Sequence, residues 1–332
     1  MTLENRLVRY KDLKPCTNAF IDTRSPGSDK KENFTIIGPG VAENPDQHVH
    51  ISIPHGFNIG AARQPAGCLN SQHSHLTEEV FVIHFGDWDF ISGVNADDGR
   101  IRLSEGDIIS IPMDIFRGFE NVGEGLGYLH AVLGSDDPGR VTWAPAVFEM
   151  AKDYGLILLE DGSLVDTTLG EQVPQNVNAM PVTSALQIAQ HRVVNGKDME
   201  SIVIRTKDFP WSDSTQLSRF SGVIEASLVG ESNDAEGIVA SKLNWQHGFV
   251  VRALKFDAGA FVSAHTRSEE EVIFVHEGEL TINVDEESIT IGKGDNFTTP
   301  IGSVRSFVNH SDKQTIVYVT RGGNAPKHAV FI

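Results

Sequence analysis

The stretch of sequence that decides the fold is residues 67–86, GCLNSQHSHLTEEVFVIHFG. It returns in altered form at residues 259–278, GAFVSAHTRSEEEVIFVHEG, at an offset of 192 residues (259 − 67). A later block, Gly106-Asp107, returns as Gly294-Asp295 at an offset of 188 residues (294 − 106). A first-copy loop that is four residues longer (192 − 188) accounts for the change. Spacing kept on both sides of an insertion indicates a duplicated domain.

Short β-rich segments dominate both copies, and Gly, Asp, Asn and Pro turns separate them. The clearest of them are residues 80–85, 127–134, 272–276 and 315–320. Two equivalent sets of short strands predict an all-β chain with two small antiparallel barrels, because closure of a barrel removes exposed sheet edges. The mouth of such a barrel is a natural site for a small molecule.

The domain boundaries follow from the repeat. We expect an N-terminal barrel at 1–150, a connecting segment with a short helix and a hairpin at 151–198, and a C-terminal barrel at 199–332. The best helix candidate is residues 144–154, and Asp161-Gly162 predicts the turn of the hairpin. A further echo between residues 8–12 and 204–208 supports a second copy that begins near Met199.

Composition excludes several classes of function. The net charge of −18 argues against a nucleic-acid partner and against an anionic membrane surface, since both require clustered Lys and Arg. Two cysteines are too few for a disulfide framework. The first residues lack the apolar core of a signal peptide, and no apolar run is long enough to span a bilayer. These features predict a cytoplasmic protein.

Three side chains in the first copy form a candidate metal site. His73 and His75 are two residues apart, so on a strand they face the same side, and Glu79 follows closely. Two imidazoles and one carboxylate that converge from one sheet face leave open coordination positions. Such a set suits non-haem Fe(II), and also Mn or Ni.

The two repeated blocks resemble the two motifs of the cupins. Residues 67–86 fit the first motif, G-x5-H-x-H-x3-E-x6-G, and the second, G-x5-P-x-G-x2-H-x3-N, fits at Gly106, Pro112 and Asn121. In the second copy the matching residues are Gly259, His265, Glu271, Gly278, Gly294, Pro300, Gly302 and Asn309. The chain therefore resembles the germin-like bicupins, which include oxalate decarboxylases, quercetin dioxygenases and gentisate-type dioxygenases. The resemblance implies two double-stranded β-helix, or jelly-roll, barrels.

The first copy departs from the cupin pattern at Arg117, where cupins usually have a fourth, histidine ligand. Arginine stays protonated and cannot bind a cation. His73, His75 and Glu79 could therefore form a three-ligand site, or Glu79 could pair with Arg117 in a vestigial barrel. Arg117 could also clamp a substrate carboxylate, which would give it a catalytic role. His130, on a later strand, is a candidate additional ligand.

The second copy keeps His265 and Glu271 but has Arg267 and Arg305 in the other two ligand places. One histidine and one carboxylate beside two guanidinium groups make a poor cation site. We interpret this set as degenerate, either an internal salt-bridge network or a pocket for an anion.

The resemblance implies one divalent metal ion per chain, foremost Fe(II), with Mn, Ni or Zn as alternatives. The leading hypothesis is a non-haem dioxygenase or oxidase that acts on a small organic or phenolic acid. One alternative is a non-redox isomerase, lyase or decarboxylase, and another is a non-catalytic binding or storage bicupin. We expect an anionic small-molecule substrate, and the barrel faces could also pair in a homo-oligomer.

Overall fold

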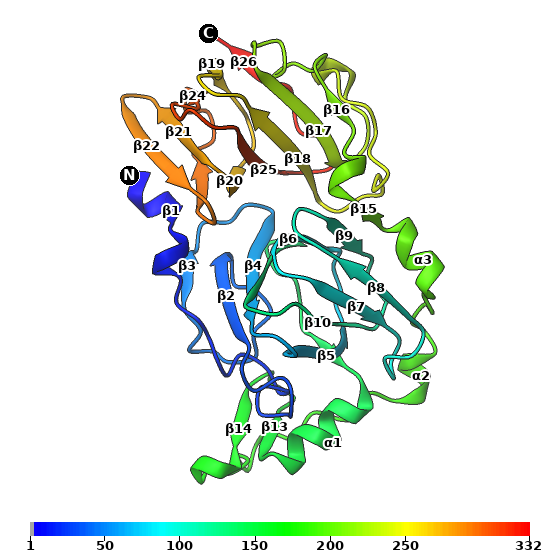
Figure 1. The fold of residues 1–332 in the computed structure, drawn as a ribbon. Coiled ribbons are helices and arrows are strands. Elements are labelled where there is room, and N and C mark those ends of the chain that lie inside the picture. The colour runs from blue at the N-terminus through cyan, green and yellow to red at the C-terminus, as the bar shows by residue number, and fades with distance from the viewer. Residues whose placement is uncertain (1–2) are drawn as a thin grey trace.

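The computed structural model describes residues 3–332 and consists mainly of β-strands, as predicted (Figure 1). Two barrels lie one above the other, and the connecting segment passes below the first barrel and then along one side of it. Within the described residues, no helix has both the length and the apolar character needed to cross a membrane.

The first barrel contains two sheets, whose strand orders are β15-β9-β6-β11-β4-β2-β3 and β12-β5-β10-β7-β8. These strands are β2 (Glu32–Ile37), β3 (Val49–Ile51), β4 (Phe57–Gln64), β5 (Leu69–Ser74), β6 (Glu79–Phe85), β7 (Trp88–Ser92), β8 (Gly99–Leu103), β9 (Ile108–Ile111), β10 (Arg117–Asn121), β11 (Gly127–Gly134), β12 (Thr142–Trp143) and β15 (Val203–Ile204).

The second barrel repeats this plan, with strand orders β1-β23-β20-β25-β18-β17-β16 and β22-β21-β24-β19-β26. These strands are β1 (Leu7–Val8), β16 (Trp211–Ser212), β17 (Val223–Val229), β18 (Phe249–Phe256), β19 (Phe261–Thr266), β20 (Glu271–Glu277), β21 (Glu279–Val284), β22 (Glu287–Gly292), β23 (Asn296–Thr299), β24 (Arg305–Val308), β25 (Thr315–Gly322) and β26 (Val330–Phe331).

The segment between the barrels holds the short elements α1 (Pro145–Asp153), β13 (Leu156–Leu158), β14 (Leu164–Asp166), α2 (Ala185–Ile188) and α3 (Gly196–Ser201). Five 3₁₀ turns complete the described residues: η1 (Leu3–Arg6), η2 (Tyr10–Asp12), η3 (Thr167–Leu169), η4 (Thr206–Asp208) and η5 (Asp234–Glu236). The predicted helix corresponds to α1, and the predicted hairpin corresponds to the antiparallel pair β13 and β14.

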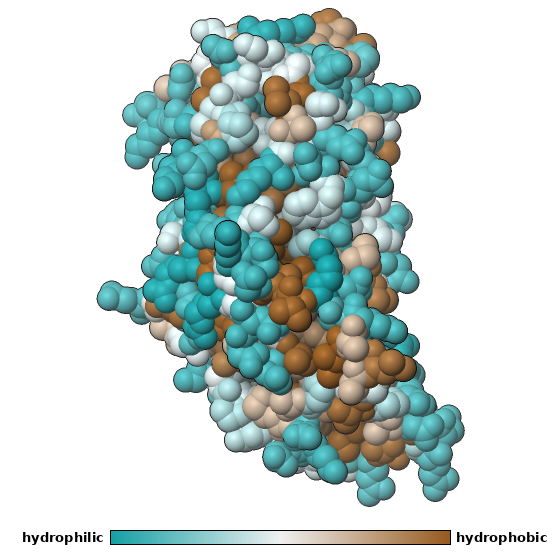
Figure 2. All heavy atoms as spheres, turned by 90° about the vertical axis from the view of Figure 1, so that its right-hand side faces the viewer, coloured by the Kyte–Doolittle hydropathy of each residue, from teal (hydrophilic) through white to brown (hydrophobic). Residues whose placement is uncertain are grey.

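The side of the molecule that carries α1, α2 and α3 exposes apolar side chains. Figure 2 shows this side, with apolar residues gathered in its lower half. The large exposed apolar residues of the connecting segment are Leu169, Val173, Val182, Leu186 and Val193. The homo-oligomer stays a prediction, because apolar exposure alone does not identify what covers it.

Two-sided burial explains why the central strands are almost continuously apolar. All eight residues of β11 are buried, since one face of the strand fills its own barrel and the other faces the second barrel. One apolar cluster spans the two barrels and includes Ile59 and Val82 from the first, with Val251 and Phe274 from the second.

The two halves exchange short N-terminal arms. Strand β1, at the start of the first half, pairs with β23 of the second barrel, and β15, at the start of the second half, pairs with β9 of the first. Asp295 accepts hydrogen bonds from Arg9 and from the Tyr10 backbone. Asp107, at the equivalent place in the first barrel, accepts bonds from Arg205 and the Thr206 backbone. The predicted boundaries do not account for this exchange.

Candidate metal centre in the first barrel

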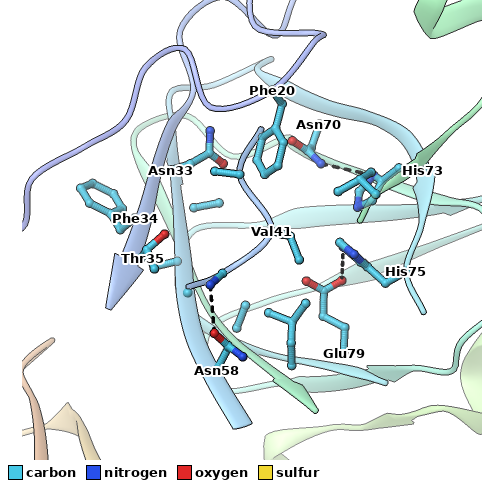
Figure 3. Close-up of a pocket in the computed structure, with 18 of the residues that line it drawn as sticks. Phe20, Asn33, Phe34, Thr35, Val41, Asn58, Asn70, His73, His75 and Glu79 are labelled. Atoms are coloured by element: carbon cyan, nitrogen blue, oxygen red, sulfur yellow. Dashed lines mark hydrogen bonds and ion pairs between the residues drawn. The ribbon is translucent and has the colours of Figure 1, made fainter. Parts of the chain in front are cut away.

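The first barrel brings His73, His75 and Glu79 together. One ligand atom from each lies within 4.8 Å of the others, and all three residues are buried. His73 lies near the end of β5, His75 follows that strand, and Glu79 begins β6. Figure 3 shows His75 directed toward the adjacent carboxylate of Glu79, with His73 nearby. The three residues predicted from their spacing in the sequence are therefore also neighbours in the structure.

The imidazole of His73 is held by the backbone. Its Nδ1 lies 2.7 Å from the carbonyl oxygen of Ser71. A carbonyl can only accept a hydrogen bond, so Nδ1 carries the hydrogen and Nε2 keeps a free electron pair. Burial, and then the positive charge of Arg117, hold the pKa of His73 well below its ordinary value. His73 is thus a neutral ring with one available donor atom.

His75 completes the pair of imidazoles. Its Nε2 lies 3.7 Å from Oε2 of Glu79, and its Nδ1 has no hydrogen-bond partner among residues 3–332. Burial, followed by Arg117 and His73, lowers its pKa well below the ordinary value. Two neutral imidazoles and a carboxylate, all shielded from water, form a donor set that fits a divalent metal ion.

Arg117 contacts the third member of the set. Its Nη2 lies 2.5 Å from Oε2 of Glu79, and Arg117 is 1% exposed. Burial raises the pKa of Glu79, and the charge and hydrogen bond of Arg117 act in the opposite direction. Arg117 is not among the residues that line the adjacent cavity. This is the arrangement expected if Arg117 neutralises Glu79, and a clamp on substrate stays a prediction.

The cavity beside the three residues has a volume of about 80 Å³. Its walls are mainly apolar, with several amide side chains among them. The residues that line it are Phe20, Asn33, Phe34, Thr35, Gly40, Val41, Ala42, Gln47, Asn58, Gly60, Ala61, Ala62, Asn70, His73, His75, Glu79, Phe81, Phe119, Ala131, Leu133, Val141 and Trp143.

The structure does not bring His130 together with the three candidate ligands. Its ring stacks on Phe274 of the second barrel, with ring centroids 4.1 Å apart and an interplanar angle of 8°. Ala131 and Leu133 lie one and three residues after His130 on β11, and both line the cavity. Because successive side chains of a strand face opposite sides, His130 points out of the first barrel. The sequence did not reveal which face of β11 points inward.

Trp143 is a site residue that the sequence reasoning missed. Strand β12 places it opposite His73, with ring centroids 5.4 Å apart. Its Nε1 donates a 2.6 Å hydrogen bond to Glu43, and burial raises the pKa of Glu43 to about 7. Glu43 also accepts a hydrogen bond from the backbone of Ile21. No local sequence pattern predicts the contact between Trp143 and His73, because the two residues are 70 positions apart (143 − 73).

In the second barrel, arginine side chains contact the glutamate at the place of Glu79. His265 keeps the backbone bond of its counterpart, with Nδ1 2.9 Å from the carbonyl oxygen of Ser263. Arg267 occupies the place of His75, and its Nε lies 2.9 Å from Glu271. Arg305 lies 3.7 Å from the same carboxylate. The geometry is that of a salt-bridge network, one of the two interpretations offered for these residues.

Glu236 and Arg321 extend this network beyond the predicted residues. Glu236 Oε1 lies 2.8 Å from Arg267 and 2.7 Å from Arg321. Burial alone would raise the pKa of Glu236, but Arg321 and Arg267 outweigh it and hold that pKa below the ordinary value. The same balance, with Arg267 and Arg305, lowers the pKa of Glu271.

Comparisons with known proteins agree with this fold. Residues 253–321, in the second barrel, match the family model described as a cupin domain. No curated protein sequence matches the chain. Among solved structures, the oxalate decarboxylase of Lactobacillus farciminis in a formate complex is similar, with a TM-score of 0.61 and 10% identity over 100% of this chain and 90% of that one.

Two further structures are similar over nearly the whole chain. Oxalate decarboxylase from Bacillus subtilis gives a TM-score of 0.58 and 11% identity, covering 100% of this chain and 79% of that one. AerE from Microcystis aeruginosa gives a TM-score of 0.52 and 11% identity, covering 96% and 99%. At these identities the likeness establishes the fold alone. Residues 253–321 thus match the cupin family model, and the whole chain has the two-barrel fold of these structures, as the bicupin resemblance implied.

Proposed function

We propose that the first barrel is a metal-dependent enzyme site for a small organic acid, and that its reaction is a non-redox cleavage of the decarboxylase or lyase class. The observation that carries the proposal is the buried grouping of His73, His75 and Glu79 beside a cavity. The similar structures named as oxalate decarboxylases favour this reaction class over the dioxygenase of our leading hypothesis.

The chain's own residues would prepare the site for an ion. The Ser71 carbonyl fixes the tautomer of His73, which leaves Nε2 available, and Glu79 supplies the negative charge. An ion held there would act as a Lewis acid that polarises a carboxylate or carbonyl oxygen. Fe(II) and Mn both suit this mixed nitrogen and oxygen set, and Ni and Zn remain alternatives.

A polar group of the cavity wall supports an acid as the ligand. The Asn33 side chain lines this cavity, and its Nδ2 has no partner among residues 3–332. An unpaired amide donor there could bind a substrate carboxylate, which suits an anionic ligand in a chain of net charge −18.

The test combines metal analysis with two product assays. Protein purified without chelators is incubated with a panel of short mono- and dicarboxylic acids that includes oxalate, and carbon dioxide release and oxygen uptake are followed in parallel. We expect product without stoichiometric oxygen uptake, loss of activity in His75→Ala, and full activity in the control His48→Ala, an exposed histidine. Consumption of one oxygen molecule per substrate molecule would contradict the non-redox reaction and support the dioxygenase hypothesis.

A second candidate function is non-catalytic binding or storage. The ion pair between Arg117 and Glu79 favours it, because the carboxylate already has a cationic partner. In that case the purified protein contains far less than one ion per chain. It would then bind an acid of the same panel in a calorimetric titration without turning it over.

A further inference from the structure

A fully buried ion pair lies behind the candidate metal centre. Lys31 Nζ contacts a carboxylate oxygen of Asp22, and neither side chain has any exposed surface. A lysine is almost never completely buried, and the desolvation of both charges opposes folding. A pair of this kind therefore requires an explanation beyond packing.

The contacts of the pair lead to His73. Lys31 Nζ donates a 2.9 Å hydrogen bond to Oδ1 of Asn70, and Oδ2 of Asp22 accepts one of 3.1 Å from the backbone N–H of Ser71. The carbonyl of Ser71 then accepts from Nδ1 of His73. The ion pair thus holds two consecutive residues of β5, and the second of them fixes the ring. Figure 3 shows Asn70 beside His73 on the same wall.

A β-bulge explains why this stretch of β5 needs support. Arg117 pairs with His73, but Phe119 pairs with Asn70, so three steps on β5 match two steps on β10. The extra residue interrupts the ladder, and bulges beside active sites re-aim side chains. Asp22 satisfies the Ser71 N–H within this bulge, which leaves the Ser71 carbonyl directed to the imidazole.

The second barrel shows that the fold does not require the cluster. The pairing of Asn33 with Ala62 recurs as Glu225 with Leu254, so the offset of 192 holds here (225 − 33 and 254 − 62). At that offset Val223 replaces Lys31 (31 + 192), and Val262 replaces Asn70 (70 + 192).

Both valines belong to an apolar core. The second barrel nevertheless has the same bulge, between Val262 and His265. A cupin barrel can therefore build this corner from apolar residues. The charged cluster is present in the barrel that keeps both histidines.

We propose that Asp22, Lys31 and Asn70 are positioning residues that fix the tautomer and direction of His73 toward a bound metal ion. The proposal rests on the proposed function of the first barrel. Asp22 and Lys31 are not among the residues that line the cavity, whereas Asn70 lines it beside His73.

The test replaces Lys31 and Asn70 by their counterparts in the second barrel and Asp22 by a small neutral residue. In the triple variant Lys31→Val, Asp22→Ser and Asn70→Val both charges are removed together, so that no buried charge is left unpaired. The probe is Co²⁺, titrated by its visible absorption into metal-free protein. We expect an affinity about 10–100-fold weaker than wild type, the usual effect of losing an outer-shell partner, with unchanged far-ultraviolet circular dichroism.

The matched control removes another ion pair of the same region. Arg63→Met with Glu32→Gln deletes the pair between β4 and β2, and should leave the Co²⁺ affinity within about twofold of wild type. If the triple variant does not fold, Asn70→Val alone keeps both charges and should weaken Co²⁺ binding by a smaller factor. Unchanged affinity in a folded triple variant or in Asn70→Val overturns the proposal.

A second readout does not depend on metal. Nitrogen-15 NMR of the metal-free protein reports which ring nitrogen of His73 carries the hydrogen. We expect a single Nδ1-protonated form in wild type and a mixture of tautomers in the variant. If wild type fails to bind Co²⁺, the proposed function fails, but the tautomer still decides the positioning role. An unchanged tautomer in the variant would overturn that role.

Discussion

The two barrels share strand order and motif spacing but treat the same buried carboxylate in opposite ways. In the first, His75 stops 3.7 Å from Glu79, and the site keeps two neutral imidazoles beside a cavity. In the second, Arg267 occupies the equivalent place and forms a 2.9 Å ion pair with Glu271. The imidazole of His75 leaves Glu79 able to bind a metal ion, whereas the guanidinium of Arg267 itself neutralises Glu271.

The comparison also separates function from stability. The first barrel has charged and polar groups that its fold does not need, such as Lys31 and Asn70, whose places the second barrel fills with valine. The second barrel has no group of metal-ligating residues among those described, and its buried Glu236 and Glu271 each contact two arginines. We infer that the first copy retained chemistry while the second became structural support.

The largest expected effect concerns metal content. His75→Ala should abolish bound metal, because it removes one of only two imidazole donors, whereas His265→Ala in the second barrel should leave the content near one ion per chain. Elemental analysis of protein purified without chelators measures both. Two ions per chain, or metal that survives the double variant His73→Ala with His75→Ala, would contradict the division between the barrels.

The next effect is on stability and belongs to the second barrel. Glu236→Gln should lower the free energy of unfolding by about 3–5 kcal/mol, since it leaves Arg267 and Arg321 buried without their shared carboxylate. Urea unfolding followed by circular dichroism gives the value. Glu231→Gln is the control, an exposed residue five positions earlier (236 − 231), and should change stability by less than about 0.5 kcal/mol.

A change at Arg117 tests whether the first barrel can regain a fourth ligand. Arg117→His should tighten Co²⁺ binding by about 1–3 kcal/mol, the scale of one charge-assisted interaction, because it removes a positive charge and adds a donor. Arg305→His should not create a site in the second barrel, since Arg267 still holds Glu271. Full activity of Arg117→His on the native substrate would rule out a substrate clamp by Arg117.

The two barrels should also respond differently to acid. Arginine neighbours hold the pKa of Glu236 and Glu271 below the ordinary value, so their contribution is present above the unfolded pKa of about 4.3 and is lost as pH falls through the folded pKa. Burial raises the pKa of Glu79, so the contribution of Glu79 to folding stability becomes more favourable as the pH falls. Hydrogen exchange below about pH 4 should therefore quicken in β20 before β6. Exchange that quickens first in β6 would refute this order.

Local spacing made the fold and the metal set predictable. The three candidate ligands lie within seven residues of chain (73–79), where the end of β5 connects to the start of β6. The facing of His130 was not predictable, because it depends on how β11 sits between β4 and β6. Glu236 was missed for a similar reason, since it reaches Arg267 from η5, 31 residues earlier (267 − 236).

The smallest effect tests the exchange of arms, which the sequence showed only as an echo. Arg9 binds Asp295 in the second barrel, and Arg205 binds Asp107 in the first, but both arginine side chains are partly exposed, at 35% and 25%. Exposed pairs contribute about 0.2–1 kcal/mol, so Arg9→Ala and Arg205→Ala should each cost no more than this. Because each arm belongs to one half and packs on the other, the double variant should destabilise both barrels in a single unfolding transition. Two separate transitions in that variant would show that the halves fold independently, and that the arms do not couple them.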